Sequence, residues 1–178
     1  MVILSTGNKD ILKWKIRLLI GIFTNKKRLE DYDTLKPIID EFKFEKKIST
    51  LVIGCGNAEF SENLYDDGYK SIYNIDISQK VIELMKERNK DKIEMKCKTK
   101  NLIIDDTMDV KELKYEDNIF DFIVDKSTID SILCGEKSFV NTAIMIKEIQ
   151  RVLKPGGIYM IISYGTPENR VFHLVNNW

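Results

Sequence analysis

Residues that bind zinc or build disulfide frameworks are scarce in this chain. Its 178 residues include three cysteines, Cys55, Cys97 and Cys134, and one histidine, His173. The cysteines are odd in number and lack the paired spacing of a structural zinc site, so no metal is expected. Unpaired cysteines are typical of a reducing compartment, and the sequence therefore predicts a cytoplasmic location.

An excess of positive charge is also absent. The 28 basic residues balance 28 acidic residues, which gives a formal net charge of zero. Nucleic-acid binding takes much of its affinity from phosphate neutralisation, so the composition gives no strong sign of a nucleic-acid partner. The 43% of hydrophobic residues and the three prolines are typical of a compact globular protein. A chain of this length fits one domain, and we expect a single domain over residues 1–178.

Long hydrophobic runs are missing as well. The apolar stretch 11–23 is too short to span a membrane and is interrupted by Lys13, Lys15 and Arg17, so no membrane span is predicted. Its pattern favours a basic amphipathic helix that packs on the domain or covers a ligand cleft, and a helix lying on a membrane surface is the alternative. Residues 1–45 are accordingly expected to form an N-terminal helical cap on a cofactor-binding core over 46–165.

Predicted strands and helices alternate along the rest of the chain. Helices are predicted over 33–44, 58–67 and 139–153, with a further helix capped by Ser78, and strands over 49–54, 71–76, 102–108, 119–125 and 158–163. The lysine-rich residues 91–101 are expected to be a solvated loop. This alternation predicts an α/β fold with a doubly wound, Rossmann-like, mainly parallel sheet and helices on both faces.

A glycine turn followed by an acidic strand end has the layout of a nucleoside-binding βαβ unit. An apolar strand enters the turn Gly54-Cys55-Gly56, and Asp76 ends the next strand. The glycines lack a Cβ and so permit a tight turn and the close approach of a ligand. The Asp76 carboxylate is placed to accept hydrogen bonds from ribose hydroxyls. A dinucleotide-binding oxidoreductase is the nearest competitor, but it requires a third glycine where this chain has Glu59, whose charge would repel a pyrophosphate.

Further candidate residues stand at the ends of two later strands. Met108, Asp109 and Val110 follow the third predicted core strand, and Asp125 and Lys126 follow the fourth. The ligand crevice of a doubly wound sheet lies at the carboxyl ends of its strands, so these residues are expected to converge on the glycine turn and Asp76.

These motifs resemble those of class I S-adenosylmethionine-dependent methyltransferases, over about residues 33–165. The matching segments are GCGN, NIDIS, MDV, FDFIVDK and RVLKPGGIYMIIS. Within that superfamily, GCGNAEFSENLYDDGY, NIDIS and DKSTIDSIL are similar to the branch that methylates lysines of translation elongation factor 1-alpha. The resemblance implies S-adenosylmethionine as cofactor, S-adenosylhomocysteine as product, and in-line methyl transfer to a lysine of a protein, with a translation factor as one candidate. A small-molecule methyltransferase and a catalytically impaired cofactor-binding protein are the alternatives.

The resemblance also implies a set of cofactor-binding residues: Gly54, Cys55, Gly56, Asn57, Glu59, Asp76, Ile77, Met108, Asp109, Val110, Asp125 and Lys126. In this set Asp76 would bind the ribose, Ile77 would pack on the adenine, and Asp109 would accept from the adenine amino group. Asp125 and Lys126 would line the methionine end.

No residue stands out as the catalytic base. Asp125, Asp130 and Tyr164 could each help a lysine lose its proton, and nothing in the sequence selects one of them. The chain also departs from the related enzymes at both ends. Their aromatic-rich N-terminal segment is represented only by Trp14 and Tyr32, and a complete terminal β-hairpin is not expected. The last predicted strand would then be an exposed edge.

Overall fold

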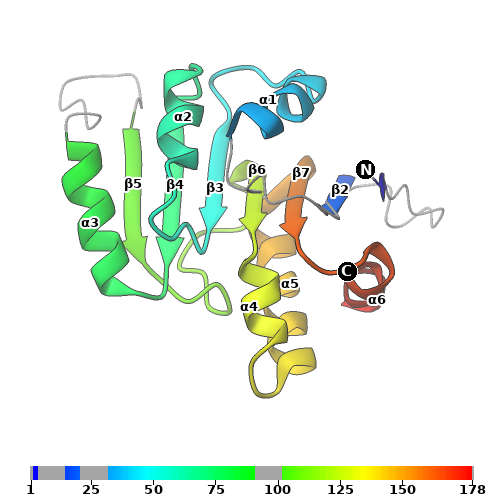
Figure 1. The fold of residues 1–178 in the computed structure, drawn as a ribbon. Coiled ribbons are helices and arrows are strands. Elements are labelled where there is room, and N and C mark those ends of the chain that lie inside the picture. The colour runs from blue at the N-terminus through cyan, green and yellow to red at the C-terminus, as the bar shows by residue number, and fades with distance from the viewer. Residues whose placement is uncertain (1, 4–14, 21–31, 91–101, 178) are drawn as a thin grey trace.

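The computed structural model describes residues 2–3, 15–20, 32–90 and 102–177 (Figure 1). In these ranges, seven strands form one sheet in the order β1-β2-β7-β6-β3-β4-β5. The strands are β1 (Val2–Ile3), β2 (Lys15–Ile20), β3 (Ser49–Ile53), β4 (Ser71–Asp76), β5 (Leu102–Thr107), β6 (Phe120–Lys126) and β7 (Leu153–Ser163). In this spatial order, every neighbouring pair from β2 through β7, β6, β3 and β4 to β5 is parallel, and only β1 pairs with β2 antiparallel.

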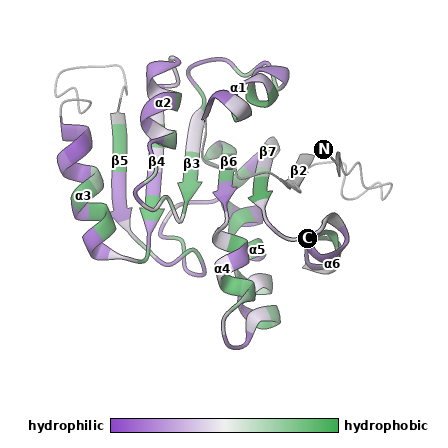
Figure 2. Cartoon of the chain, in the orientation of Figure 1, coloured by the Kyte–Doolittle hydropathy of each residue, from purple (hydrophilic) through white to green (hydrophobic). Residues whose placement is uncertain are grey.

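Helices cover both faces of this sheet, as the alternating pattern predicted. They are α1 (Tyr32–Glu41), α2 (Phe60–Asp66), α3 (Gln79–Asn89), α4 (Thr128–Leu133), α5 (Ser138–Val152) and α6 (Pro167–Asn177). Two apolar clusters form the core, one on each face. The first three helices contribute to one cluster through Leu35, Leu64 and Met85, and the last three contribute to the other through Ile129, Ile149 and Leu174. Figure 2 shows hydrophilic residues along much of α2 and α3, as expected for helices that bury only one face.

Most predicted elements are confirmed, with shifted ends. Helix α1 begins at Tyr32 and ends at Glu41, three residues before the predicted end, and contains Pro37 in its interior. Helix α3 begins after Ser78, whose hydroxyl accepts from Val81 N at 3.4 Å, as expected for an N-cap. Strand β7 starts five residues earlier than predicted because the KPGG segment continues the strand through an irregular stretch of pairing with β6. Helices α4 and α6 were not predicted.

The prediction of a helix over residues 11–23 is wrong for its described part. Lys15–Ile20 form strand β2, which pairs in parallel with β7 from Ile158 to Ser163. The run is short, and Lys15, Ile16, Arg17 and Leu18 alternate polar with apolar, which is a strand period. The unpaired backbone of β7 supplies the partner that favours the strand. Residues 11–14 and 21–23 lie outside the described part of the chain.

The expectation that the last core strand is an exposed edge is therefore also wrong. Strand β2 occupies the far side of β7 from β6, and the chain after β7 forms α6 rather than a strand (Figure 1). The predicted loop at 91–101 falls outside the described residues, as does Trp14. Across the described ranges, no helix is both long enough and apolar enough to cross a membrane.

Candidate functional site

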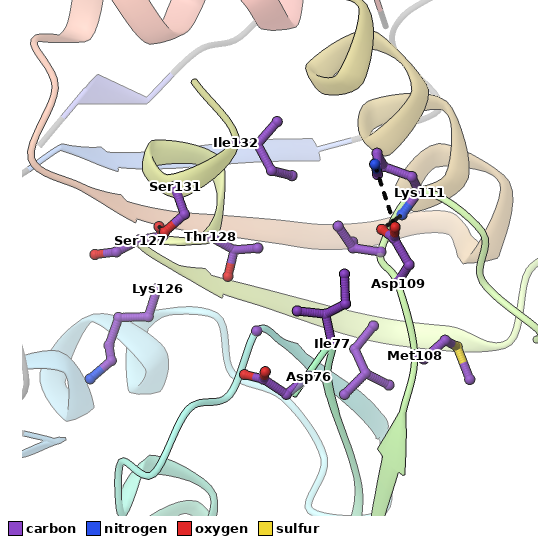
Figure 3. A pocket seen from close by; sticks show the side chains of 13 residues that line it. Asp76, Ile77, Met108, Asp109, Lys111, Lys126, Ser127, Thr128, Ser131 and Ile132 are labelled. Atoms are coloured by element: carbon purple, nitrogen blue, oxygen red, sulfur yellow. Dashed lines mark hydrogen bonds and ion pairs between the residues drawn. The ribbon is translucent and has the colours of Figure 1, made fainter. Parts of the chain in front are cut away.

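A cavity of about 400 Å³ lies at the carboxyl ends of the parallel strands (Figure 3). This volume falls in the range of small-ligand sites. The lining comes from the ends of β3, β4, β5 and β6 and from α4: Gly54, Ile75, Asp76, Ile77, Met108, Asp109, Val110, Lys111, Lys126, Ser127, Thr128, Ser131 and Ile132.

The predicted cofactor-binding residues divide into two groups. Those that line the cavity are Gly54, Asp76, Ile77, Met108, Asp109, Val110 and Lys126. Those outside its lining are Cys55, Gly56, Asn57, Glu59 and Asp125. Asn57 and Glu59 are exposed at the start of α2, and the Cys55 thiol is buried, which raises its pKa to about 12 and makes it a poor nucleophile.

The glycine turn is closed by a contact with α4. Gly54 has a φ of +54°, a conformation that favours glycine. The hydroxyl of Thr128 donates to Ile53 O at 2.9 Å, and a Cβ on Gly54 would lie 2.2 Å from that hydroxyl oxygen. The first turn of α4 therefore occupies the space that any other residue at position 54 would need.

Asp76 anchors the turn from the opposite side. Its Oδ2 accepts from Gly56 N at 3.0 Å, and its Oδ1 accepts from Ser78 N at 2.9 Å. The backbone N–H of Cys55 donates to Ile75 O at 3.0 Å. The N–H groups of Cys55 and Gly56 are thus both engaged within the protein, whereas a phosphate-binding turn directs such groups at its ligand.

The neighbouring wall of the cavity combines apolar side chains with a second carboxylate. Ile77 is 71% exposed at the cavity although it is a large apolar residue, and Met108 (Figure 3) and Val110 line the same cavity. Asp109 accepts from Lys111 N at 2.9 Å and pairs with Lys111 Nζ at 3.4 Å. The apolar side chains of this wall can pack against the face of a flat ring, and the Asp109 carboxylate can accept a hydrogen bond from a polar group on the edge of that ring.

Asp125 is buried beneath α4 instead of facing the cavity. Its carboxylate accepts from Thr128 N at 2.8 Å, from Ile129 N at 3.2 Å and from the Tyr159 hydroxyl at 2.9 Å. Burial raises its pKa to about 7, although these hydrogen bonds to the charged form oppose that rise. Asp125 thus anchors the helix that supplies Thr128, Ser131 and Ile132 to the cavity.

The sequence did not point to six residues that line the cavity. One is Ile75 in β4, and the others are Lys111, Ser127, Thr128, Ser131 and Ile132. All but Ile75 and Lys111 belong to or directly precede α4, which was not predicted. The DKSTIDSIL segment was the available signal, because its apolar residues Ile129, Ile132 and Leu133 have the i, i+3, i+4 spacing of a helix. Ser127 has a φ of +68°, unusual for a residue with a side chain, and such outliers cluster at functional sites.

Of the other two candidates for a catalytic base, Asp130 is also constrained by the fold, whereas Tyr164 is exposed. Asp130 forms an ion pair with Arg170 at 2.6 Å and accepts from Tyr164 N at 2.9 Å. Its carboxylate is thereby held in a structural role. The Tyr164 side chain is 69% exposed.

Arg88 of α3 holds the glycine turn at its far end. Its guanidinium donates to Asn57 O at 3.0 Å and to Ala58 O at 3.2 Å, and its Nε pairs with the buried Glu62 at 2.6 Å. The planar guanidinium makes these contacts at once because its donors are fixed in a fork. Arg88 does not line the cavity, so it acts on the site through the backbone of the turn.

We expect Arg88→Lys to weaken both folding and ligand binding. The lysine keeps a positive charge beside Glu62 but lacks the fork that reaches both carbonyls. Loss of one of these hydrogen bonds should lower the free energy of unfolding by about 1 kcal/mol, and the loosened turn should raise the Kd for the cofactor, measured by calorimetry. Lys86→Met, an exposed change on the same helix, is the matched control and should leave Kd unchanged. An unchanged Kd in Arg88→Lys would contradict the role.

Comparison with known proteins places these features in a wider group. A family model described as a methyltransferase domain matches residues 44–177. The chain is 43% identical over 119 residues to a mouse (Mus musculus) protein named eEF1A lysine and N-terminal methyltransferase, an alignment that covers 66% of this chain and 16% of that protein. The zebrafish (Danio rerio) protein of the same name is 31% identical over 151 residues, which cover 83% of this chain and 21% of the relative.

A solved structure shares the fold. The crystal structure of a SAM-dependent methyltransferase from Methanosarcina mazei superimposes with a TM-score of 0.58 and 30% sequence identity, covering 70% of this chain and 56% of that one. The chain spans only a small part of the length of the curated relatives it matches, 16% of the mouse protein.

Proposed function

Since this chain belongs to the methyltransferase domain family, we propose that its cavity binds S-adenosylmethionine and that it methylates a lysine side chain of a protein. Support for the acceptor comes from the relatives named as eEF1A lysine methyltransferases, so a translation elongation factor is the first acceptor to test. A cytosolic location, expected from the cysteine content, stays a prediction.

The cofactor assignment is supported chiefly by the way the glycine turn uses its N–H groups. The N–H groups of Cys55 and Gly56 are bonded to Ile75 and Asp76, so they are not offered to a phosphate. A ligand without phosphate therefore suits this turn better than a dinucleotide does. S-adenosylmethionine has no phosphate and carries a sulfonium and an ammonium, which favour a site with carboxylates.

The cavity residues fit the remaining parts of such a ligand. Asp76 and Asp109 supply acceptors at neighbouring strand ends, suited to the ribose hydroxyls and the adenine amino group. Ile77, Met108 and Val110 supply apolar surface for the adenine ring. Gly54, Ser127 and Thr128 bound the remaining part of the cavity, where the methionine portion would lie.

When bound, S-adenosylmethionine supplies an electrophilic methyl group. The acceptor nitrogen would need its lone pair to take this methyl group, with the electron pair of the broken C–S bond left on sulfur, and so it would have to be neutral. Asp125 and Asp130 are both engaged in structural contacts, and we therefore assign the lysine proton to solvent rather than to either carboxylate. The protein's own contribution is to orient the two reactants and to limit the water between them.

Two measurements test this function. Calorimetry should show binding of S-adenosylmethionine and S-adenosylhomocysteine but no binding of NAD, and failure of both adenosyl ligands to bind would refute the cofactor assignment. Incubation of the protein with methyl-labelled cofactor and a cell lysate should place label in protein, with methyl-lysine recovered after hydrolysis. Label found only in small metabolites would support a small-molecule methyltransferase, and cofactor binding without any transfer would indicate an impaired enzyme.

A further inference from the structure

The turn that follows β7 is held by a dense set of polar contacts. Asp130 accepts from the Ser163 hydroxyl, from Tyr164 N at 2.9 Å and from Arg170 Nη2 at 2.6 Å. The Ser163 hydroxyl oxygen in turn accepts from Gly165 N at 3.0 Å and from Arg170 Nε at 2.7 Å. A Cβ on Gly165 would lie 2.2 Å from the Arg170 guanidinium carbon, so a larger residue there would displace this guanidinium. The backbone of Tyr164 is therefore fixed from both sides.

This turn lies beside the cavity. Lys126 pairs with Ile162 in the register between β6 and β7, and Ser127 N donates to Ile162 O at 2.9 Å. Lys126 and Ser127 line the cavity, and Tyr164 follows only two residues after their partner. The Tyr164 backbone therefore follows directly on the strand that is paired with the end of β6, next to Lys126 and Ser127. On α4, the residue bonded to Tyr164 N is Asp130, next to the cavity-lining Ser131.

The chemistry that the turn presents is aromatic rather than charged. The Asp130 and Arg170 side chains are 15% and 13% exposed and neutralise each other, whereas Tyr164 is 69% exposed. An aromatic ring attracts a cation over its face, and a phenol oxygen accepts from an N–H donor. In Figure 3 the Lys126 ammonium extends away from Ser131 and Ile132, so it does not place a positive charge at the α4 side of the site.

We propose that Tyr164 forms the acceptor-side edge of the methyl-transfer site and recognises the alkylammonium group of the incoming side chain, with Asp130 and Arg170 as positioning residues. This inference rests on the proposed function, because it takes the cavity to hold the methyl donor. It identifies the acceptor class as a cationic amine on a flexible chain, and it explains why an exposed tyrosine stands on a rigid turn.

A lysine side-chain analogue tests the proposal without requiring the natural acceptor. Butylammonium is titrated by NMR into the full chain loaded with S-adenosylhomocysteine. We expect saturable shifts of the Tyr164 ring signals, a two- to five-fold weaker Kd in Tyr164→Ala, and nearly wild-type binding in Tyr164→Phe, which keeps the ring. Phe139→Ala on α5, which removes another exposed aromatic (64%), is the matched control and should bind as the wild type does.

Equal binding of butylammonium by Tyr164→Ala and the wild type would overturn the proposal, as would an equal loss in Phe139→Ala. The Kd for S-adenosylhomocysteine, measured by calorimetry on the same variants, should not change. A wild-type protein that fails to bind S-adenosylhomocysteine refutes the proposed function instead, and the two failures are distinguished by these separate titrations.

Discussion

Gly54→Ala is expected to abolish measurable cofactor binding and to lower the free energy of unfolding by about 2 to 5 kcal/mol. Two effects add at this position. The backbone conformation, with a φ of +54°, is strained for alanine, and the new Cβ would fall 2.2 Å from the Thr128 hydroxyl oxygen. Since Thr128 is in the first turn of α4, relief of the clash moves that helix away from the cavity it lines.

Gly56→Ala separates the two effects. Gly56 has nearly the same φ, +56°, but nothing lies within 4 Å of a Cβ placed there. Alanine at position 56 should cost only the conformational strain, about 1 to 2 kcal/mol in urea denaturation. The double variant Gly54→Ala/Thr128→Ala should recover part of the lost stability because it removes the clashing hydroxyl. Equal costs at positions 54 and 56 would contradict this explanation.

Asp125→Ala is expected to be the second most damaging single change, lowering the free energy of unfolding by about 2 to 5 kcal/mol. The alanine removes the carboxylate that accepts from the first N–H groups of α4. The buried Tyr159 hydroxyl loses the same acceptor. Because α4 lines the cavity, cofactor affinity should fall as well. Urea denaturation and calorimetry measure the two losses.

The pH dependence of stability separates the effect of the Asp125 charge from the effect of the side chain's shape, which asparagine keeps. Burial raises the Asp125 pKa to about 7, so between the usual carboxyl range and pH 7 the unfolded chain has lost this proton while the native protein retains it. The wild type should therefore lose stability relative to Asp125→Asn as pH rises, by about 1.4 kcal/mol per pH unit across that interval. Above about pH 7 the difference should level off. Denaturation series at pH 5, 6, 7 and 8 check this, and a constant difference would refute the raised pKa.

The fold was predictable from the sequence where local signals agree with tertiary contacts. The strands that become β3, β4, β5 and β6 each contain apolar residues that parallel sheets bury, and a glycine or an acidic residue stands at or near the end of each. The strand ends then had to converge, which is why Asp76 and Asp109 were predicted at one site and do line one cavity.

Two kinds of feature could not be predicted. Helix α4 is short, so its local pattern is weak, and it is held by the buried Asp125 at its start and by the long-range contact of Thr128 with Ile53, which the sequence does not show. The direction of Asp125 was also hidden, because a strand-end carboxylate can face the cleft or turn under the next helix. Strand β2 was mistaken for a helix because a short amphipathic run has no decisive period until its neighbour is known.

The place of β2 in the sheet has a consequence for how the sheet forms. Lys15 and its partner Ile158 are far apart in the sequence. The pairing of β2 with β7 therefore carries the entropic cost of closing a very long loop. We infer that the sheet from β3 to β6 assembles first and that the β2–β7 seam is the last part of the sheet to form.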